Sequence, residues 1–220
     1  LRGEQDFLLD KANLAPRLSA AFKTGKESQI SASWGIFYQS PEDSILFRTS
    51  RLGFEQATHY ILNYQIFRNQ RIFRIETFYK KYDNLVRTLD DYNNTGNGYA
   101  QGIELFFRDR KTLTWGDFWI SYSYLDTRRL HRAFPQKAMP DFAAEHNASF
   151  VFKYFFSKKQ ISANLSYTVQ TGRPYYNPDN PEFLADRTPM YNNLSVQVAK
   201  LTSIFGNFTV LVASVSNVLW

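Results

Sequence analysis

The chain has 220 residues, of which 26 are Lys or Arg and 20 are Asp or Glu, giving a net charge of +6. It contains no cysteine, which excludes disulfide scaffolds, thiolate metal or iron–sulfur sites and cysteine nucleophiles. Aromatic residues make up 17% of the sequence, which excludes a disordered chain, and the negative mean hydropathy excludes a bundle of membrane helices. These values are compatible with a membrane β-barrel, because its strands alternate lipid-facing residues with polar residues and its mean hydropathy is therefore low.

Ten strands are predicted from residues that alternate between apolar and polar along the chain. In the second strand, Ile30, Trp34 and Tyr38 alternate with polar residues such as Gln29 and Ser31. Most of these strands have about ten residues or more, whereas strands of soluble sheets have about five or six and membrane-crossing strands need roughly 9–11. Their length therefore favours the membrane. The predicted strands span 14–22, 29–40, 58–68, 73–80, 100–110, 115–126, 147–156, 161–170, 191–201 and 207–218.

The two faces of these strands differ in kind. One face carries bulky Phe, Tyr, Trp and Ile, and the other carries Ser, Asn, Gln and charged residues. Aromatic residues near strand ends match the girdle that membrane proteins place at the lipid–water interface. The alternative is a soluble sandwich with a large aromatic core, because sandwich strands alternate as well. The candidate girdle residues are Tyr38, Tyr60, Tyr79, Trp115 and Tyr124.

The connections between the strands alternate between short and long. This alternation is typical of outer-membrane barrels, which have tight periplasmic turns and long extracellular loops. Both ends of the chain would then lie on the extracellular side, which indicates a fragment or a further element at one end. The short connections span 23–28, 69–70, 111–114, 157–159 and 202–206, and the long ones span 41–57, 83–99, 127–145 and 171–190.

Three further features of the sequence bear on the class of protein. Basic residues are spread along the chain and do not cluster on one periodic face, which argues against nucleic-acid binding. The uncharged run 201–220 is long enough for a membrane helix, but its valines favour strand. The charged start of the sequence is not a signal peptide, so we expect a mature product or an internal piece.

Two of the long connections carry the candidate ligand-binding residues. The connection 127–145 is rich in cations, which would attract an anionic ligand or lipopolysaccharide. The connection 171–190 contains an arginine and two tyrosines that could stack on a ligand. Solvated loop charges and tyrosines that only fold their own loop are the alternatives. The candidates are Arg128, Arg129, Arg132, Arg173, Tyr175 and Tyr176.

No catalytic or metal site is predicted. The histidines His59, His131 and His146 have no spacing that would hold a metal, and no phosphate loop or nucleophile elbow is present. We therefore expect no cofactor and no enzyme activity. A barrel hydrolase is the alternative, in which His131 would act with loop carboxylates from Asp90, Asp91, Asp126 and Asp141.

Seven segments together resemble strands of the TonB-dependent outer-membrane receptors. The resemblance is to receptors of the Bacteroidetes type. The segments span 16–19, 30–39, 57–64, 96–105, 140–147, 171–176 and 215–218. In that family a barrel of about 22 strands encloses an N-terminal plug, and a TonB-box segment couples uptake to the inner-membrane motor. The resemblance implies that residues 1–220 form the C-terminal part of such a barrel, and that the plug domain and the TonB box are absent from this chain.

The resemblance also implies a function and partners. The expected fold is an all-β antiparallel transmembrane barrel in the bacterial outer membrane, which binds and imports a nutrient such as a siderophore, glycan, peptide or cofactor. The expected partners are outer-membrane lipid and lipopolysaccharide, the remaining strands and plug, and TonB through the plug segment, with no nucleic acid. A surface lipoprotein is a further candidate partner.

Ten strands cut from a larger sheet leave two unpaired edges, which lipid does not tolerate. The alternative is therefore a self-contained ten-stranded barrel that acts as an adhesin or structural protein or as a surface hydrolase. The narrow lumen of such a barrel would be filled by side chains. Inward charges would then form an ion-pair network from Arg74, Glu76, Glu104, Arg108, Asp117 and Lys153.

Overall fold

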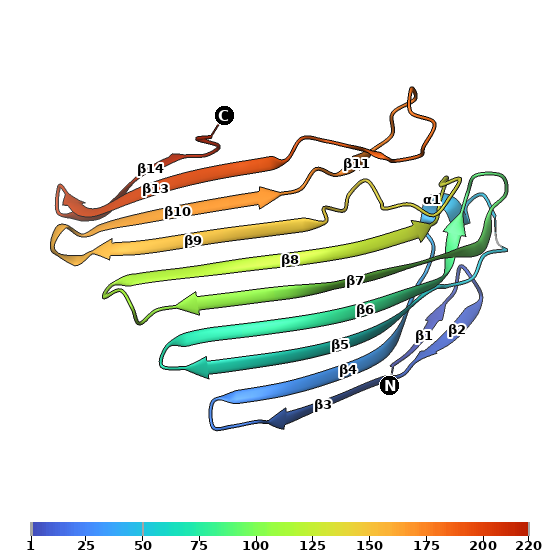
Figure 1. The fold of residues 1–220 in the computed structure, drawn as a ribbon, viewed down its shortest axis with the longest axis horizontal. Helices are drawn as coiled ribbons and strands as arrows, with labels where there is room; N and C mark the ends of the chain where they lie inside the picture. The colour runs from blue at the N-terminus through green and yellow to red at the C-terminus, as the bar shows by residue number, and fades with distance from the viewer. Residues whose placement is uncertain (1, 50, 220) are drawn as a thin grey trace.

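A computed structural model describes residues 2–49 and 51–219, and most of this chain forms one ten-stranded antiparallel sheet (Figure 1). The all-β prediction is confirmed. In the described residues no helix has the length and apolar character that a membrane span requires. The sheet contains β3 (Arg17–Lys23), β4 (Ser28–Gln39), β5 (Glu55–Arg68), β6 (Arg71–Arg87), β7 (Asn93–Asp109), β8 (Gly116–Leu130), β9 (His146–Phe156), β10 (Ile161–Gln170), β13 (Tyr191–Ile204) and β14 (Asn207–Val215).

The chain also forms small elements outside this sheet, which the alternation of apolar and polar residues did not predict. They are the hairpin of β1 (Arg2–Asp6) and β2 (Lys11–Ala15), the short helix α1 (Asp43–Leu46), the 3-10 turn η1 (Ser157–Lys159), and the ribbon of β11 (Pro174–Tyr175) and β12 (Asp186–Arg187). The predicted strand 14–22 is divided at Pro16, whose nitrogen has no hydrogen to donate to a neighbouring strand. Trp220, the last residue of the uncharged run 201–220, lies outside the described residues.

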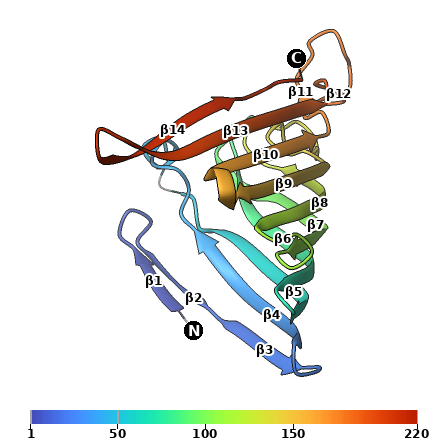
Figure 2. The ribbon, with the colours of Figure 1, turned by 90° about the vertical axis from the view of Figure 1, so that its left-hand side faces the viewer.

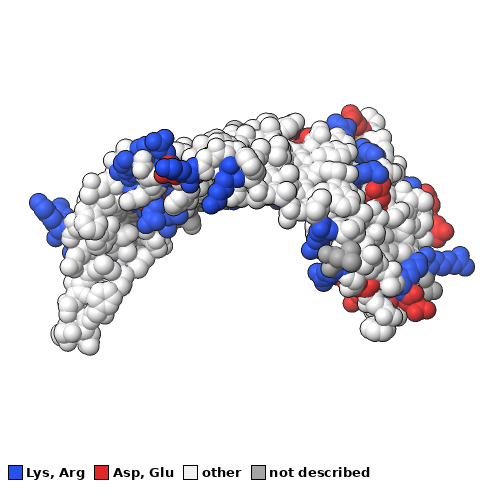
Figure 3. Space-filling model, turned by 90° about the horizontal axis from the view of Figure 1, so that it is seen from below, with Lys and Arg blue, Asp and Glu red and all other residues white. Residues whose placement is uncertain are grey.

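The sheet is bent into an open trough (Figures 2 and 3). Its strand order runs from β3 to β14 without a return, and in the described part of the chain β3 and β14 do not pair with each other. The alternative of a ten-stranded barrel that closes on itself is therefore wrong for this structure. Each end of the sheet presents a row of backbone groups that another strand has to satisfy in lipid.

Strand register places apolar and polar residues on opposite faces. Residues directly paired across neighbouring strands point to the same side, and successive residues alternate. Tyr60 pairs with Tyr79 on what we call the outer face, whereas Asn63 pairs with Glu76 on what we call the inner face. The sheet thus separates one surface for lipid from one for water.

The charges of the inner face do not form the predicted ion-pair network. Arg108 forms an ion pair with Asp117, but Arg74 and Lys153 lie over aromatic rings instead, 5.7 Å from the Phe106 ring centre and 5.1 Å from the Trp119 ring centre. An open trough exposes these groups to water, where an unpaired charge costs little. The network prediction assumed a closed, filled lumen.

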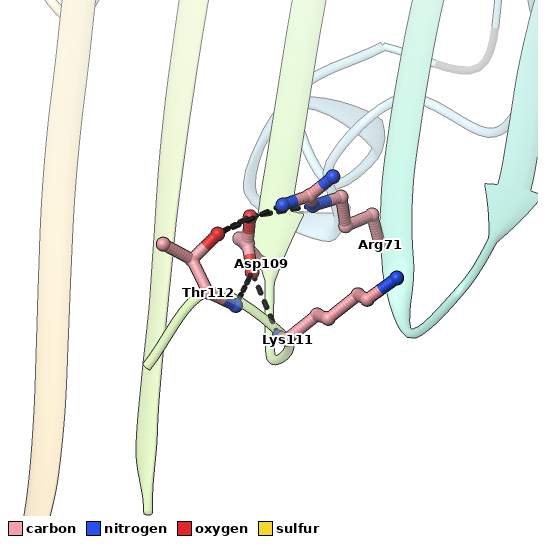
Figure 4. A network of polar contacts seen from close by, with 4 residues as sticks. All are labelled: Arg71, Asp109, Lys111 and Thr112. Atoms are coloured by element: carbon pink, nitrogen blue, oxygen red, sulfur yellow. Dashed lines mark hydrogen bonds and ion pairs between the residues drawn. The ribbon is translucent and has the colours of Figure 1, made fainter. Parts of the chain in front are cut away.

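Two of the long connections are shorter than predicted. β6 continues to Arg87 and β7 begins at Asn93, so only 88–92 link them instead of 83–99. β8 likewise continues to Leu130, which shortens the connection 127–145 to 131–145. Four short connections lie within a residue or so of their predicted bounds, and the fifth, predicted at 202–206, is reduced to 205–206 because β13 continues to Ile204. The connection after β7 is organised by Asp109 (Figure 4). Its carboxylate accepts the backbone N–H groups of Lys111 and Thr112, both at 2.8 Å, and the Arg71 Nε–H at 2.7 Å.

The buried residues gather where the long connections meet. We call this region the loop cap; it comprises the β1–β2 hairpin, residues 40–54 and 131–145, and the adjoining ends of β6 and β7. Leu52, Leu85 and Val86 are buried there. Asn94 bonds in both directions with Gly53, accepting its N–H at 2.7 Å and donating to its carbonyl at 3.2 Å. The strands below have no core of their own, because their two faces are turned to lipid and to the trough.

The two free edges predict how the isolated chain behaves. We expect the 220-residue chain, refolded into detergent micelles, to show no change in gel mobility on boiling, because β3 and β14 leave unpaired backbone groups in the apolar layer. A complete small barrel refolded in the same micelles serves as the control. A boiling-dependent shift accompanied by strong β circular dichroism would show that the edges pair and that the sheet closes alone.

Candidate functional site

Cationic and aromatic side chains meet on the inner face just below the loop cap. The Arg17 guanidinium carbon lies 4.3 Å from the centre of the Phe37 ring. Phe37 stacks on the His59 imidazole, with 4.4 Å between ring centres. Lys80 pairs in register with His59, and its Nζ lies 5.0 Å from the Phe78 ring centre. Four neighbouring strands therefore contribute to one surface.

Arg129 extends this surface across β7. Its guanidinium carbon lies 4.1 Å from the Tyr82 ring centre and 5.5 Å from that of Phe142 in the loop cap. Gly98 stands between Tyr82 and Arg129 in the register, and a Cβ at Gly98 would lie 2.9 Å from Arg129 Cγ. The missing side chain and the concave bend let Arg129 reach over a whole strand. We call the full set the cation–aromatic band: Arg17, Phe37, His59, Phe78, Lys80, Tyr82, Arg129 and Phe142.

The cation–aromatic band is suited to an anionic ligand. For Arg17, Lys80 and Arg129, the described residues supply no acidic partner within ion-pair distance. Clustered cations on a concave surface attract anions, and an arginine fork matches carboxylate or phosphate geometry. The rings beside them offer flat surfaces for stacking.

The three predicted arginines of the connection 127–145 are separated by the structure. Arg129 belongs to the cation–aromatic band, and Arg132 forms an ion pair with Glu42 in the loop cap. Arg128 lies on the outer face, because successive residues of β8 alternate sides. The prediction that Arg128 and Arg129 lie in a loop is wrong, since β8 continues to Leu130 and Arg129 pairs with Ala138 beyond it.

The residues predicted in the connection 171–190 form a second group, away from the band. Tyr176 lies 6.0 Å from Phe183 between ring centres, and Phe183 lies 5.1 Å from Phe134 of the loop cap. Tyr175 is part of the β11–β12 ribbon. Arg173 lines a cavity of about 580 Å³ at the ends of β10 and β13. A role for Arg173, Tyr175 and Tyr176 in binding stays a prediction.

Most of the cation–aromatic band was not predicted. Phe37 and Phe78 did carry a signal, because both occupy positions of the polar face, where an aromatic residue has no lipid to contact. No sequence signal indicates the contact between Arg129 and Tyr82, because it joins two strands, β8 and β6, that are not neighbours in the sheet.

The structure does not bring the residues of the hydrolase alternative together into a catalytic site. Asp126 lies on the outer face, where the Tyr99 hydroxyl and the Gln101 amide donate to it at 3.1 and 2.9 Å. His131 lies in the loop cap, with its ring centre 4.5 Å from that of Phe134. Among residues 2–49 and 51–219, no three His, Cys, Asp or Glu side chains converge as metal ligands would.

Residues 2–218 match the family model described as TonB dependent receptor-like, beta-barrel. The chain belongs to this family. TonB-dependent receptors of this kind lie in the outer membrane, so the long connections and the loop cap face the cell exterior. The family is one of receptors and not of hydrolases. No curated protein matches the sequence.

Solved structures of other receptors share the fold at low sequence identity. The FrpB iron transporter from Neisseria meningitidis is 15% identical, with a TM-score of 0.73 over 94% of this chain and 34% of its own. The outer-membrane transporter YddB from Escherichia coli is 13% identical, with a TM-score of 0.78 over 98% and 38%. The ferric-catecholate import receptor Fiu from Escherichia coli K12 is 10% identical, with a TM-score of 0.70 over 88% and 29%. The chain thus spans about a third of the length of these receptors.

His131 predicts a pH dependence of the loop cap. Burial, followed by the charges of Arg129 and Arg132, lowers the pKa of His131 to about 4. The folded pKa lies below the unfolded value, so the stabilisation is present near neutral pH and is lost as the pH falls from about 6.5 towards 4. In the full-length receptor, we expect amide exchange in residues 131–145, corrected for intrinsic rates, to rise about three- to tenfold between pH 7 and pH 5.

His131→Phe keeps a ring against Phe134 but cannot take up a proton, so this variant should show a flat pH profile in the same region. His146→Phe, outside the loop cap, is the matched control and should keep the wild-type profile. Equal pH profiles in wild type and His131→Phe would contradict the assignment.

Proposed function

We propose that the chain forms part of the wall and extracellular mouth of a receptor that imports an anionic nutrient by a TonB-dependent mechanism. The observation that carries the proposal is the cation–aromatic band, whose Arg17, Lys80 and Arg129 face the trough beside half-buried rings. The band lies directly below the loop cap, where a ligand entering from outside would first meet the inner face.

We assign a ferric chelate of the siderophore type as the nutrient. Among the similar structures, FrpB is titled an iron transporter, Fiu a ferric-catecholate import receptor, and FyuA from Yersinia pestis a ferric yersiniabactin uptake receptor. A ferric catecholate combines negative charge with flat rings, which is the chemistry that cations and aromatic faces recognise together. Glycan, peptide and cofactor are the competing nutrients. The Bacteroidetes-type assignment is a prediction that these structures, all from other bacteria, do not support.

The remaining partners follow from the same proposal. β3 and β14 would pair with the other strands of the barrel, and the inner face would contact the plug. TonB would act through the plug segment, which residues 1–220 do not include, and a surface lipoprotein would bind at the extracellular end.

Adjacent arginines on opposite faces test the proposal. In the full-length receptor, Arg129→Ala should weaken binding of a ferric catecholate about tenfold or more, because a charge-assisted contact contributes about 1.5–3 kcal/mol. Arg128→Ala is the matched control and should leave the binding unchanged, since its side chain faces outward. Binding would be measured by quenching of intrinsic fluorescence, with ferric citrate and a neutral oligosaccharide as contrasting probes.

Energy-dependent uptake of the same chelate by cells completes the test. Uptake should disappear when TonB is removed and should fall with Arg129→Ala at equal surface display. Binding that is lost in Arg173→Ala or Tyr176→Ala but kept in Arg129→Ala would move the site to the connection 171–190. Surface display without any energy-dependent uptake would favour an adhesive barrel.

A further inference from the structure

A second group of cations and rings lies on the inner face, near the short turns at the end of the strands opposite the loop cap (Figure 1). Arg74 pairs in register with Phe106, and its guanidinium carbon lies 5.7 Å from the centre of that ring. Arg108 pairs in register with Trp119, with 5.4 Å between its guanidinium carbon and the indole. Lys153 approaches the same indole from β9, with its Nζ at 5.1 Å. Four neighbouring strands, β6 to β9, therefore contribute to one surface.

This surface has more positive than negative charge. We call it the lower cluster; it comprises the five residues just named and Asp117. Asp117 forms an ion pair with Arg108 and pairs in register with Lys153. For Arg74 and Lys153, residues 2–49 and 51–219 supply no acidic side chain within ion-pair distance. Three cations and one carboxylate leave two positive charges in excess beside two aromatic faces.

The lower cluster is accessible from the trough. Arg74 and Lys153 are exposed, and Phe106 and Trp119 are half-buried, so part of each ring faces the open side of the sheet. Arg74 and Lys153 lie against rings and not against carboxylates. An incoming anion can therefore accept hydrogen bonds from both cations without displacing an acidic partner.

The lower cluster is separate from the cation–aromatic band. Lys80 and Arg74 are six residues apart on β6, which corresponds to about 20 Å along an extended strand. Glu76 and Glu104 pair in register in the inner-face row next to Arg74, on the side of the band. An acidic row thus divides the two cationic surfaces, and an anion would bind at one of them and not between them.

We propose that the lower cluster is a second binding site for the anionic, ring-containing nutrient, occupied after the nutrient leaves the cation–aromatic band and before it reaches the periplasm. The inference rests on the proposed function and adds a site to the import route. Both surfaces offer the same chemistry, which is a pair of available cations beside flat rings. A transported ligand has to leave every site that it occupies, which favours several sites of moderate affinity over a single tight one.

The charges also determine which of the two sites binds more weakly. Asp117 neutralises Arg108 in the lower cluster, and the acidic row of Glu76 and Glu104 lies beside it. The cations of the band have no such partner among residues 2–49 and 51–219. The lower cluster should therefore hold an anion less tightly than the band does, which suits a site from which the nutrient is released.

The test uses the full-length receptor in detergent, where both mouths of the barrel are accessible, and a ferric catecholate as the probe. In a calorimetric titration we expect a tight phase that Arg129→Ala weakens, and a second phase about tenfold weaker, because one cation of the lower cluster is already neutralised. The double variant Arg74→Gln, Lys153→Gln should weaken only the second phase, about tenfold or more, because each substitution removes a charge-assisted contact. Trp119→Leu should weaken the second phase without removing a charge.

Lys23→Gln is the matched control. Lys23, Gln29, Gln65 and Arg74 form one register row, so Lys23 faces the trough at the level of Arg74 but three strands away from it. This variant should titrate like the wild type in both phases. In cells, the double variant should lower energy-dependent uptake severalfold at equal surface display, whereas Lys23→Gln should not. All variants must keep the boiling-dependent gel shift of the wild type, which establishes that they are folded.

The two proposals fail in different ways. A wild-type receptor that shows the tight phase alone would overturn the second site and leave the proposed function standing. A double variant that keeps the second phase but unfolds at a lower temperature would also overturn it, because the lower cluster would then hold the plug in place. A titration without the tight, Arg129-dependent phase would instead overturn the proposed function.

Discussion

The structure depends on one constraint, which is that every strand faces lipid on one side and water on the other. Backbone hydrogen bonds between antiparallel strands hold a single register across the sheet, and that register assigns each side chain to one of the two environments. The outer face can therefore be built from tyrosines, leucines and phenylalanines that would be a liability on a soluble protein. The inner face can carry isolated charges because water reaches them.

The same constraint explains where the sequence was informative. Strand 161–170 coincides with β10, because its alternation is unbroken and both of its neighbours are strands of the same sheet. The strand ends were predicted wrongly where the strands extend beyond the membrane, because residues there no longer alternate between lipid and water. β6 and β7 continue past the predicted strand ends as a projecting hairpin, and β8 continues to Leu130, although nothing in 127–130 alternates as a lipid-facing strand does.

The candidate site was the less predictable part for a related reason. Its residues come from six segments, and the contact of Arg129 with Tyr82 needs both the bend of the sheet and the absence of a side chain at Gly98 between them. The sequence shows that 127–137 is rich in cations, but it does not tell which of the arginines faces the trough. That choice is made by the register of β8, which pairing with β7 and β9 fixes.

The adjacency of Arg128 and Arg129 carries a consequence for how such receptors can diverge. A one-residue insertion within the paired part of β8, before Arg128, would exchange the two arginines between faces and would turn every other side chain on one side of the insertion to the wrong environment. A two-residue insertion would restore both. Beyond Leu130 pairing with β7 stops, so an insertion there can have an odd or an even number of residues. Sequence change in the wall is thus restricted to even steps, whereas the mouth can gain or lose residues singly and acquire new ligands.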